Sequence, residues 1–274
     1  VLEESAAGLE EVVVVGYGTM KKADLTGSVS QVKTETLEAV PVYNMEQALK
    51  VGAAGVRVSQ NSGTPGSRIE VRIRGGNSMI GDNQPLYVVD GFPVTGGIDF
   101  LNPSDIESVD ILKDASATAI YGSRGANGVV IITSKRGAKG QDSKIEINSF
   151  FGNQEAINRY DLLDAQEYAI IANEWLKNEG LDPFFDPNTV VNPGTDWWDA
   201  VFRVAPVTNN TITFSGSSEK GRYSISGNYY DQEGIIENSG VVRGSVRLNL
   251  DQQLKSWLKM GVNLQLSRNE QNLV

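Results

Sequence analysis

The sequence predicts an α+β domain followed by antiparallel strands of an incomplete transmembrane β-barrel. Up to residue 137, short helices and short strands alternate, and capping residues and glycines bound them. After a polar, glycine-rich linker at residues 136–142, the pattern changes to long strands in which apolar and polar residues alternate. The connections between these strands are alternately short and long, which is typical of a barrel with tight turns at one end and longer loops at the other.

Composition argues against several kinds of chemistry. The 274 residues carry 24 Lys+Arg against 34 Asp+Glu, a net charge of −10, whereas a nucleic-acid groove needs clustered positive charge. The sequence has neither cysteine nor histidine, so it lacks thiolate nucleophiles, Ser-His-Asp and Cys-His arrangements and the commonest zinc ligand. We therefore expect no catalytic, cofactor-binding or metal site, and no enzyme.

The first part of the α+β domain reads as strand, helix and two further strands. Residues 25–32 alternate as a strand. Asn44 is placed to cap a helix that Gly52 ends, because amide side chains favour the N-cap and glycine the C-terminal stop. Residues 55–58 form the next strand, and residues 69–73 alternate apolar with charged side chains.

The later part of this domain has the clearest succession of elements. Asn102 is placed to cap a short helical turn, and Asp114 to cap a helix of small residues that ends at Gly122. Strands are predicted at residues 109–112 and 129–133. The second of these runs is apolar throughout, which suits a strand buried on both faces.

Three segments of the domain resemble a known family. Residues 69–75 (IEVRIRG), 85–91 (PLYVVDG) and 102–137 are closely similar to the plug domain of SusC/RagA-type TonB-dependent outer-membrane transporters, and the resemblance runs from residue 9 to residue 137. It implies a barrel of about 22 strands around a plugged lumen. It also implies three parts: an N-terminal segment with the TonB box (1–20), the plug domain (21–140), and the first strands and an extracellular loop of the barrel (141–274).

A valine-rich segment near the start of the chain has two interpretations. Residues 10–18 (EEVVVVGYG) form an extended strand readily, but four valines cannot make a stable sheet alone and need a partner edge. The strand either joins this chain's own domain or docks on the sheet of another protein. The family resemblance implies the second, with TonB binding at Glu11, Val12, Val13, Val14, Val15 and Gly16.

Two loops rich in Gly, Asn and Asp, residues 77–83 and 92–100, read as simple connecting turns on the residues alone. The family architecture implies instead that they lie on the outer surface of the plug and face the incoming ligand. Their polar side chains would bond to hydroxyls or amides, and their rings would stack on a sugar or a side chain. The candidates are Asn77, Asp82, Asn83, Phe92, Asp99 and Phe100.

Five long alternating strands are predicted in the second half, at residues 144–151, 208–217, 222–231, 242–251 and 257–267. One face of each is apolar and the other is charged or amide-bearing. Such alternation also fits a soluble sandwich, but the order of short and long connections favours a barrel. Five strands cannot close a barrel, so we expect them to belong to a longer chain. Aromatic residues near the strand ends suit an interface girdle: Phe150, Phe151, Tyr223, Tyr229, Tyr230 and Trp257.

The long connection at residues 152–207 is expected to carry its own structure. Asp164 and Glu167 form an N-cap pair for an amphipathic helix. A second short helix is predicted near Trp197 and Trp198, whose rings either offer a platform for a sugar or pack the loop on itself.

The resemblance implies TonB-dependent import of a nutrient, an oligosaccharide or a peptide, across the outer membrane. The plug would lie in the barrel lumen and the N-terminus in the periplasm. The implied partners are TonB with its inner-membrane energy-coupling proteins, a SusD-like surface lipoprotein, the ligand and outer-membrane lipid, and no nucleic acid. Three alternatives stay open: a siderophore or cobalamin receptor of the same architecture, a soluble β-sandwich binding protein, and a glycosidase using paired carboxylates.

Overall fold

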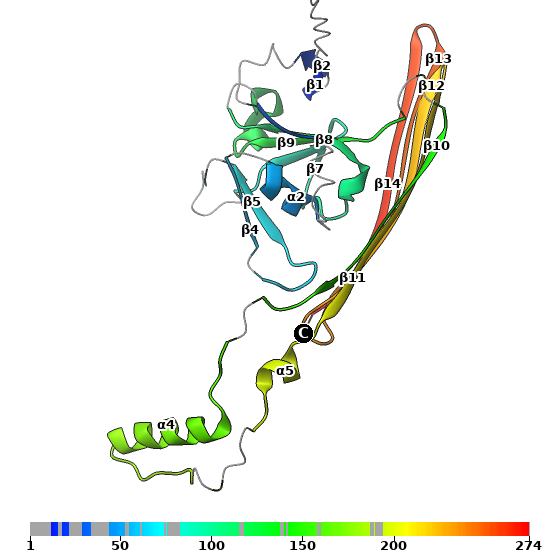
Figure 1. The fold of residues 1–274 in the computed structure, drawn as a ribbon. Helices are drawn as coiled ribbons and strands as arrows, with labels where there is room; N and C mark the ends of the chain where they lie inside the picture. Colours follow the sequence, from blue (N-terminus) through cyan, green and yellow to red (C-terminus); the bar gives the residue numbers. More distant parts are fainter. Residues whose placement is uncertain are drawn as a thin grey trace, which may run out of the picture.

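The computed structural model describes residues 12–15, 18–21, 29–33, 44–52, 55–60, 62–73, 75, 83–114, 118–137, 140, 142–157, 160–186, 189 and 194–273. They form an N-terminal domain of short elements and, beside it, one tall sheet of long strands, which we call the wall (Figure 1). No helix in these ranges is long and apolar enough to cross a membrane.

The N-terminal domain is built on a five-stranded mixed sheet in the order β3-β8-β9-β6-β7. Only β6 and β9 are parallel; the other neighbours are antiparallel. The strands are β3 (Val29–Lys33), β6 (Leu86–Val89), β7 (Phe92–Val94), β8 (Ile106–Leu112) and β9 (Val129–Ser134). The two strands predicted after residue 102 are therefore confirmed, and each extends beyond its predicted bounds.

Around this sheet lie shorter elements. They are the helix α2 (Met45–Gly52), the hairpin β4–β5 (Val56–Gln60 and Ile69–Ile73), the 3-10 helices η2 (Pro103–Asp105) and η3 (Ala119–Gly125), and the hairpin β1–β2 (Val12–Val15 and Gly18–Lys21). Asn102 caps η2 as predicted, with its side chain accepting from the Ser104 N–H at 3.3 Å. Gly122 has φ 61° and ψ −149°, a conformation that favours glycine, and it interrupts η3, which continues to Gly125, whereas the sequence predicted that it ends the helix.

The sheet of this domain is buried on both faces, as the apolar run of β9 predicts. Val130 and Ile132 pack into the larger core, together with residues of α2, β5 and β8. Val129 and Ile131 point to the other face, where they form a smaller core that Tyr121 of η3 covers. Alternate residues of one strand thus serve two cores, which is the pattern of a central strand.

The wall consists of five antiparallel strands in sequence order. They are β10 (Lys144–Gln154), β11 (Ala205–Ser218), β12 (Gly221–Glu233), β13 (Gly240–Lys255) and β14 (Leu258–Asn272). All five predicted strands are present, and each is longer than predicted. Residues such as Ile147, Ile212, Gly227, Val246 and Leu266 stand directly opposite one another across the five strands.

The two faces of the wall differ in polarity. The face toward the N-terminal domain buries polar side chains: Thr211, Ser215, Ser224, Ser226, Asn228, Gln232, Arg243, Ser245, Arg247 and Asn249. The opposite face leaves apolar side chains exposed: Ile145, Ile147, Phe151, Ile212, Phe214, Ile225, Val246, Val262, Leu264 and Leu266. A sandwich would bury the apolar face against a second sheet. This polarity is that of a barrel stave with lipid outside and a polar lumen inside.

One aromatic residue departs from the expected girdle. Tyr230 is only 2% exposed and faces the N-terminal domain, where its hydroxyl donates to Gln232 Oε1 at 2.7 Å. Its neighbour Tyr229 points outward and is half exposed. Alternation along this strand assigned Tyr229 to the apolar face with Tyr223 and Ile225, whereas Tyr230 was expected only to lie near a strand end.

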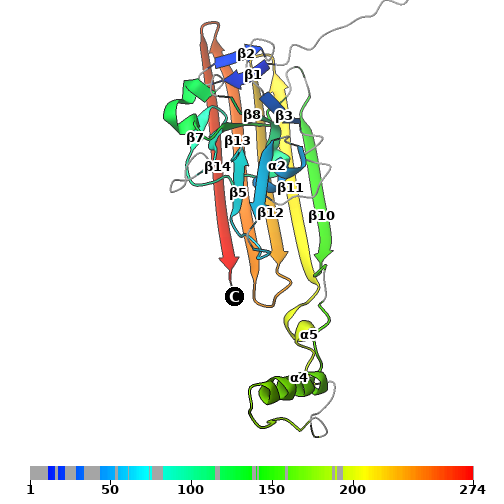
Figure 2. The same ribbon diagram turned by 90° about the vertical axis from the view of Figure 1, so that its left-hand side faces the viewer.

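The short turns lie at one end of the wall and the long connections at the other, as predicted (Figures 1 and 2). The longest connection carries α4 (Ala165–Asn178) and α5 (Trp197–Val201) and extends away from both domain and wall. The predicted cap of α4 is present as a full capping box between Asp164 and Glu167. The Trp198 ring packs on Phe202, with 4.4 Å between centroids, so this part of the loop packs on itself.

Candidate functional site

The N-terminal domain and the wall meet through a row of charged and amide side chains. Asp90 occupies the turn between β6 and β7, where it and Gly91 have φ of 49° and 89°. Two successive positive φ values are typical of the two-residue hairpin turn that matches strand twist. The Asp90 carboxylate accepts from the Ser134 N–H at 3.0 Å and from its hydroxyl, and it pairs with Arg247 of β13. The side chains of Asp90 and Arg247 are only 2% and 6% exposed.

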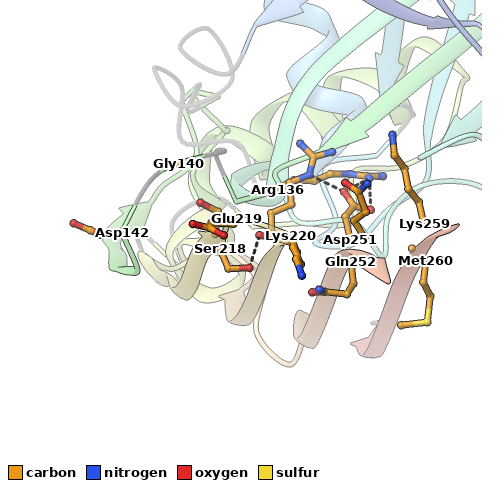
Figure 3. A pocket seen from close by; sticks show the side chains of 15 residues that line it. Arg136, Gly140, Asp142, Ser218, Glu219, Lys220, Asp251, Gln252, Lys259 and Met260 are labelled. Atoms are coloured by element: carbon orange, nitrogen blue, oxygen red, sulfur yellow. Dashed lines mark hydrogen bonds and ion pairs between the residues drawn. The ribbon is translucent and has the colours of Figure 1, made fainter. Parts of the chain in front are cut away.

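The chain that follows β9 is bound by Asn249 and Asp251, which lie beyond Arg247 on the same face of β13. Asn249 donates to Ser134 Oγ at 3.0 Å and to the Lys135 carbonyl at 2.9 Å. Arg136 donates to both carboxylate oxygens of Asp251, at 3.0 and 2.8 Å, and Figure 3 shows this pair beside the short turns. Asn249 and Asp251, which lie two positions apart on one face of β13, thus bind the consecutive residues 134–136 at the end of the N-terminal domain.

We call the side chains of Asp90, Ser134, Arg136, Arg247, Asn249 and Asp251 the anchor. Removing one partner of a buried ion pair leaves an uncompensated charge, at a cost of about 3–5 kcal/mol. The Asp90–Arg247 pair is buried enough for that figure to apply, whereas Arg136 and Asp251 are partly exposed and contribute less. The anchor therefore positions the N-terminal domain on the wall more than it adds net stability.

A second set of contacts lies further along the wall, toward the long loops. Arg243 donates to the backbone carbonyls of Asp99 and Leu101, at 2.8 and 3.2 Å, and its guanidinium lies 5.5 Å from the centre of the Tyr230 ring. Asn102 donates to the Thr211 hydroxyl at 3.2 Å. Two of these three hydrogen bonds have the charged Arg243 guanidinium as donor and contribute about 1.5–3 kcal/mol net each, whereas the neutral bond from Asn102 contributes about 1 kcal/mol.

The domain also approaches the wall closely at a glycine. A Cβ placed on Gly137 would lie 2.2 Å from the Gly216 carbonyl oxygen and 2.7 Å from that of Tyr223. Both atoms belong to the backbone of wall strands and cannot move aside easily. Only glycine fits where the chain passes from the N-terminal domain to the wall.

Two cavities lie along this contact. One, of about 630 Å³, lies beside the short turns and is lined by Arg136, Lys220, Asp251 and Lys259 among others (Figure 3). The other, of about 520 Å³, lies between the N-terminal domain and the end of β14, with Glu46, Ser62, Thr64, Asp99 and Gln271 in its lining.

The most unusual group at the second cavity is Glu46, in the first turn of α2. Its Oε1 accepts from the Ile98 N–H at 3.2 Å, and the side chain is almost fully buried. Burial raises the pKa of Glu46 from 4.5 to about 7, opposed mainly by backbone hydrogen bonds from Glu46 itself and Ile98. Burial likewise raises the pKa of Asp105, whose charge is partly stabilised by a hydrogen bond from Ser226 of the wall.

The structure describes four of the six residues that were predicted to bind TonB. Val12–Val15 form β1, which pairs antiparallel with β2 from Val12 opposite Lys21 to Val15 opposite Gly18. Glu11 and Gly16 lie outside the described residues. One edge of the valine strand is thus taken by its own hairpin, so docking would use the other edge or an opened hairpin.

Among the predicted ligand-facing residues, Asp99 lines the cavity next to β14, while Asn83, Phe92 and Phe100 are not among its lining residues. Phe92 is 68% exposed and begins β7, so residues 92–94 form a strand rather than the predicted loop. Phe100 is half-buried and packs against the larger core. Asn77 and Asp82 fall outside the described residues.

The residues that sequence reasoning missed are those of the N-terminal domain that meet the wall, above all Asp90, Ser134 and Glu46. An Asp-Gly pair between two apolar runs is a strong hairpin signal, and it would have found the turn at Asp90. The wall side of the anchor (Arg247, Asn249 and Asp251) lies on the polar face of β13 that alternation predicts, and Arg243 of the second set of contacts lies on the same face. In the described ranges no group of three acidic side chains is arranged to hold a metal ion.

Comparisons with known proteins agree with this arrangement. A family model for the TonB-dependent receptor plug domain matches residues 21–129. The chain is 43% identical over 265 residues to TonB-dependent receptor P3 of Formosa agariphila, covering 96% of this chain and 25% of the relative. It is 38% identical over 272 residues to TonB-dependent receptor SusC of Bacteroides thetaiotaomicron, covering 96% and 26%.

A solved structure of the RagAB peptide importer in its open-open state superposes with a TM-score of 0.81 at 32% identity, covering 96% of this chain and 33% of that one. The chain thus spans about a quarter of the length of the curated relatives it matches. Taken with a polar wall that binds a compact domain on one side and exposes apolar side chains on the other, these similarities show that the chain belongs to the SusC/RagA-type TonB-dependent transporters, of which it carries the plug domain and the first barrel strands.

Proposed function

We propose that the protein to which this chain belongs imports a nutrient, an oligosaccharide or a peptide, across the outer membrane with energy delivered by TonB. The observation that carries the proposal is the two-faced wall, whose polar face holds the plug domain and whose apolar face is exposed. A domain bound to the lumen side of a barrel blocks it, so passage requires that the domain be displaced or remodelled.

In this proposal residues 1–20 are the coupling segment, residues 21–140 the plug domain and residues 141–274 the start of the barrel. The short turns face the periplasm and the long loops face the cell exterior, which is the usual polarity of such barrels. TonB pairs with the segment around Val12–Val15 by adding a strand to it. A few backbone hydrogen bonds of about 1 kcal/mol net each make this contact weak and reversible, as a repeated pulling cycle requires.

A SusD-like surface lipoprotein delivers the cargo on the outer side. The similarity to SusC and to the RagAB peptide importer supports this partner and this range of cargo. Growth on defined carbon and iron sources separates nutrient import from uptake of a siderophore or cobalamin.

The coupling role is tested by deleting residues 11–16 from the full-length protein in its native host. We expect uptake of the cargo to stop while binding of cargo at the cell surface stays unchanged, because the deleted segment lies far in sequence from the wall contacts. A deletion of the same length in the long connection, residues 181–186, controls for shortening the chain. Uptake that continues at the wild-type rate after deletion of residues 11–16 would refute the coupling role.

A further inference from the structure

The apolar face of the wall, which points away from the plug domain, carries a groove. A cavity of about 710 Å³ opens there across strands β10 to β14, and we call it the apolar groove. Its sides are aliphatic side chains that stand in one row across the strands: Ile147, Ile212, Val246 and Leu266. Its volume falls within the usual range of ligand pockets, roughly 300–1,000 Å³.

Two glycines form the floor of the apolar groove. Gly227 of β12 lies in the middle of the aliphatic row, and Gly244 of β13 lies in the next row toward the long loops. A Cβ placed on Gly227 would lie 3.8 Å from its nearest neighbour, Cγ2 of Ile212, and a Cβ on Gly244 would meet nothing within 4 Å. Each glycine thus leaves open the space of one side chain. The floor is sheet backbone, whose polar groups are paired within the sheet, so an apolar chain can lie on it without leaving a polar group unsatisfied.

A positive charge marks the long-loop end of the groove. The row that contains Gly244 also contains Asn210, Tyr229 and Arg268. The two rows on the other side of the aliphatic row, toward the short turns, are uncharged: Phe214, Ile225, Leu248 and Leu264, then Gly216, Tyr223, Leu250 and Val262. Among the described residues of these four rows, Arg268 is the one charged side chain. Tyrosine is enriched where a membrane meets water, so Tyr229 indicates that Arg268 lies at such a boundary.

Arg268 is able to bind an anion at the end of the groove. Its guanidinium pairs with Glu270 at 2.5 Å, but the two side chains are 84% and 60% exposed. An exposed pair of this kind contributes about 1 kcal/mol or less, so another anion can replace Glu270 at little cost. A phosphate suits this position because a guanidinium binds it through two parallel N–H donors. The groove and Arg268 together match a molecule with an apolar chain and a phosphate at one end.

We propose that the apolar groove seats an acyl chain of the phosphorylated glycolipid that forms the outer leaflet of outer membranes, with a phosphate of that lipid bound by Arg268. The choice of leaflet rests on the import function proposed above, which places the long loops outside the cell. A phospholipid of the inner leaflet would hold its phosphate near the short turns, and no residue of the short turns lines the groove.

The test uses the full-length protein, purified in detergent and stripped of lipid. It is titrated with bisphosphorylated lipid A, with lipid A from which the phosphates have been removed, and with phosphatidylglycerol, and native mass spectrometry gives the affinity for each. We expect bisphosphorylated lipid A to bind most tightly.

Two variants separate the phosphate contact from the groove. Arg268→Gln should lose about tenfold in affinity for bisphosphorylated lipid A, as expected for a hydrogen-bonded charge pair, and stay within about twofold of the wild type for the dephosphorylated lipid. Gly227→Leu fills the groove with a side chain and should lose about tenfold for both forms, because the acyl chain is excluded.

Each variant has a matched control. Arg124→Gln removes an exposed arginine from η3 of the plug domain, and Val262→Leu adds bulk to the apolar face outside the groove. Both should bind lipid A as the wild type does, and gel mobility of heated and unheated samples checks that every variant is folded.

Three lipid-binding results would each overturn the proposal. They are equal affinity of folded Gly227→Leu and wild type for lipid A, equal losses in Arg268→Gln for the two forms of lipid A, and phosphatidylglycerol binding as tightly as bisphosphorylated lipid A. A change of the protein itself from dimer to monomer in Gly227→Leu, with lipid binding unchanged, would overturn it in favour of a second copy of the protein in the groove.

The two proposals fail separately. If the import function is wrong, uptake survives deletion of residues 11–16 while lipid A binding still depends on Gly227 and Arg268. If the lipid site is wrong, lipid binding is indifferent to these two residues while uptake still depends on the deleted segment.

Discussion

At the scale of single residues, the chain buries charge where the plug domain meets the wall. Asp90 and Arg247 are 157 positions apart in sequence, yet they form an ion pair whose two side chains are almost fully buried. Such pairs add little net stability compared with an apolar contact of the same shape, but they penalise every arrangement in which one partner is left alone. The pair therefore specifies where the plug domain sits.

Breaking this pair should be costly only when one charge is left behind. We expect Asp90→Ala and Arg247→Met, each alone, to lower the stability of the full-length protein by about 3–5 kcal/mol. The double variant should recover much of this loss, because no unpaired charge remains. Calorimetric unfolding in detergent provides the measurement. Glu70→Ala, which removes an exposed pair with Arg72, is the control and should change stability by about 1 kcal/mol or less. Additive losses in the double variant would contradict the pairing.

Glu46 is expected to make the plug domain less stable as the pH rises, the opposite of the usual effect of an acidic side chain. Its folded-state pKa of about 7 lies above its ordinary value of 4.5, so the folded protein binds the proton more tightly than the unfolded chain does. The resulting stabilisation is fully present below about pH 4.5, declines as the pH rises to about 7 and is absent above that.

Glu46→Gln removes this dependence while keeping the acceptor for Ile98. We expect the variant to be more stable than the wild type at pH 8, by an amount on the order of 3 kcal/mol, and the difference to shrink to nearly nothing at pH 4.5. Thermal unfolding of both proteins from pH 4.5 to 8 measures the difference curve. A difference that does not change with pH would show that Glu46 titrates normally.

At the scale of elements, period-two alternation located all five wall strands and assigned Arg243, Arg247 and Asn249 to one face. Alternation reports which side chains share a face, and it does not report what that face binds. The plug-domain partners of Arg243 and Asn249 lie more than 100 residues away in the chain, in a loop and at the end of β9, and they reach the wall only once the sheet of the plug domain has packed. The anchor was for this reason predictable on the wall side and not on the plug side.

Strand ends were predicted less well than strand centres. The wall strands continue past their predicted bounds because neighbouring strands supply backbone partners even where alternation fades, as at Gln154 opposite Ala205. Within the plug domain, residues 92–100 were predicted to be a loop because the segment is rich in Gly and Asp. Its first three residues instead form β7, an edge strand, where Pro93 is acceptable.

The passage from plug domain to wall should tolerate no side chain at Gly137. We expect Gly137→Ala to reduce the folded fraction of the full-length protein, because its Cβ would overlap backbone atoms of β11 and β12. Gly63→Ala, whose Cβ meets nothing within 4 Å, is the matched control and should fold normally. The folded fraction is read from the mobility difference between heated and unheated samples in gel electrophoresis. Equal folded fractions for the two variants would show that the approach at Gly137 is not restrictive.

At the scale of the whole molecule, the polarity of the wall is the reverse of that of a soluble sheet. The wall's apolar side chains are exposed, and its charged and amide side chains are buried against another domain. That arrangement is stable only if lipid covers the exposed face and the plug domain fills the space behind the wall. The five strands and the plug domain thus make sense together as one sector of a filled barrel (Figure 2).

The plug domain, residues 21–140, is proposed to fill the barrel lumen, and electrical conductance tests this directly. The full-length protein and a variant lacking residues 21–140 are reconstituted in planar lipid bilayers, after gel mobility confirms that both barrels are folded. We predict that the intact protein conducts almost no current and that the deletion opens large, stable channels. A folded deletion variant that stays closed, or an intact protein that already conducts as well as the variant, would contradict the account.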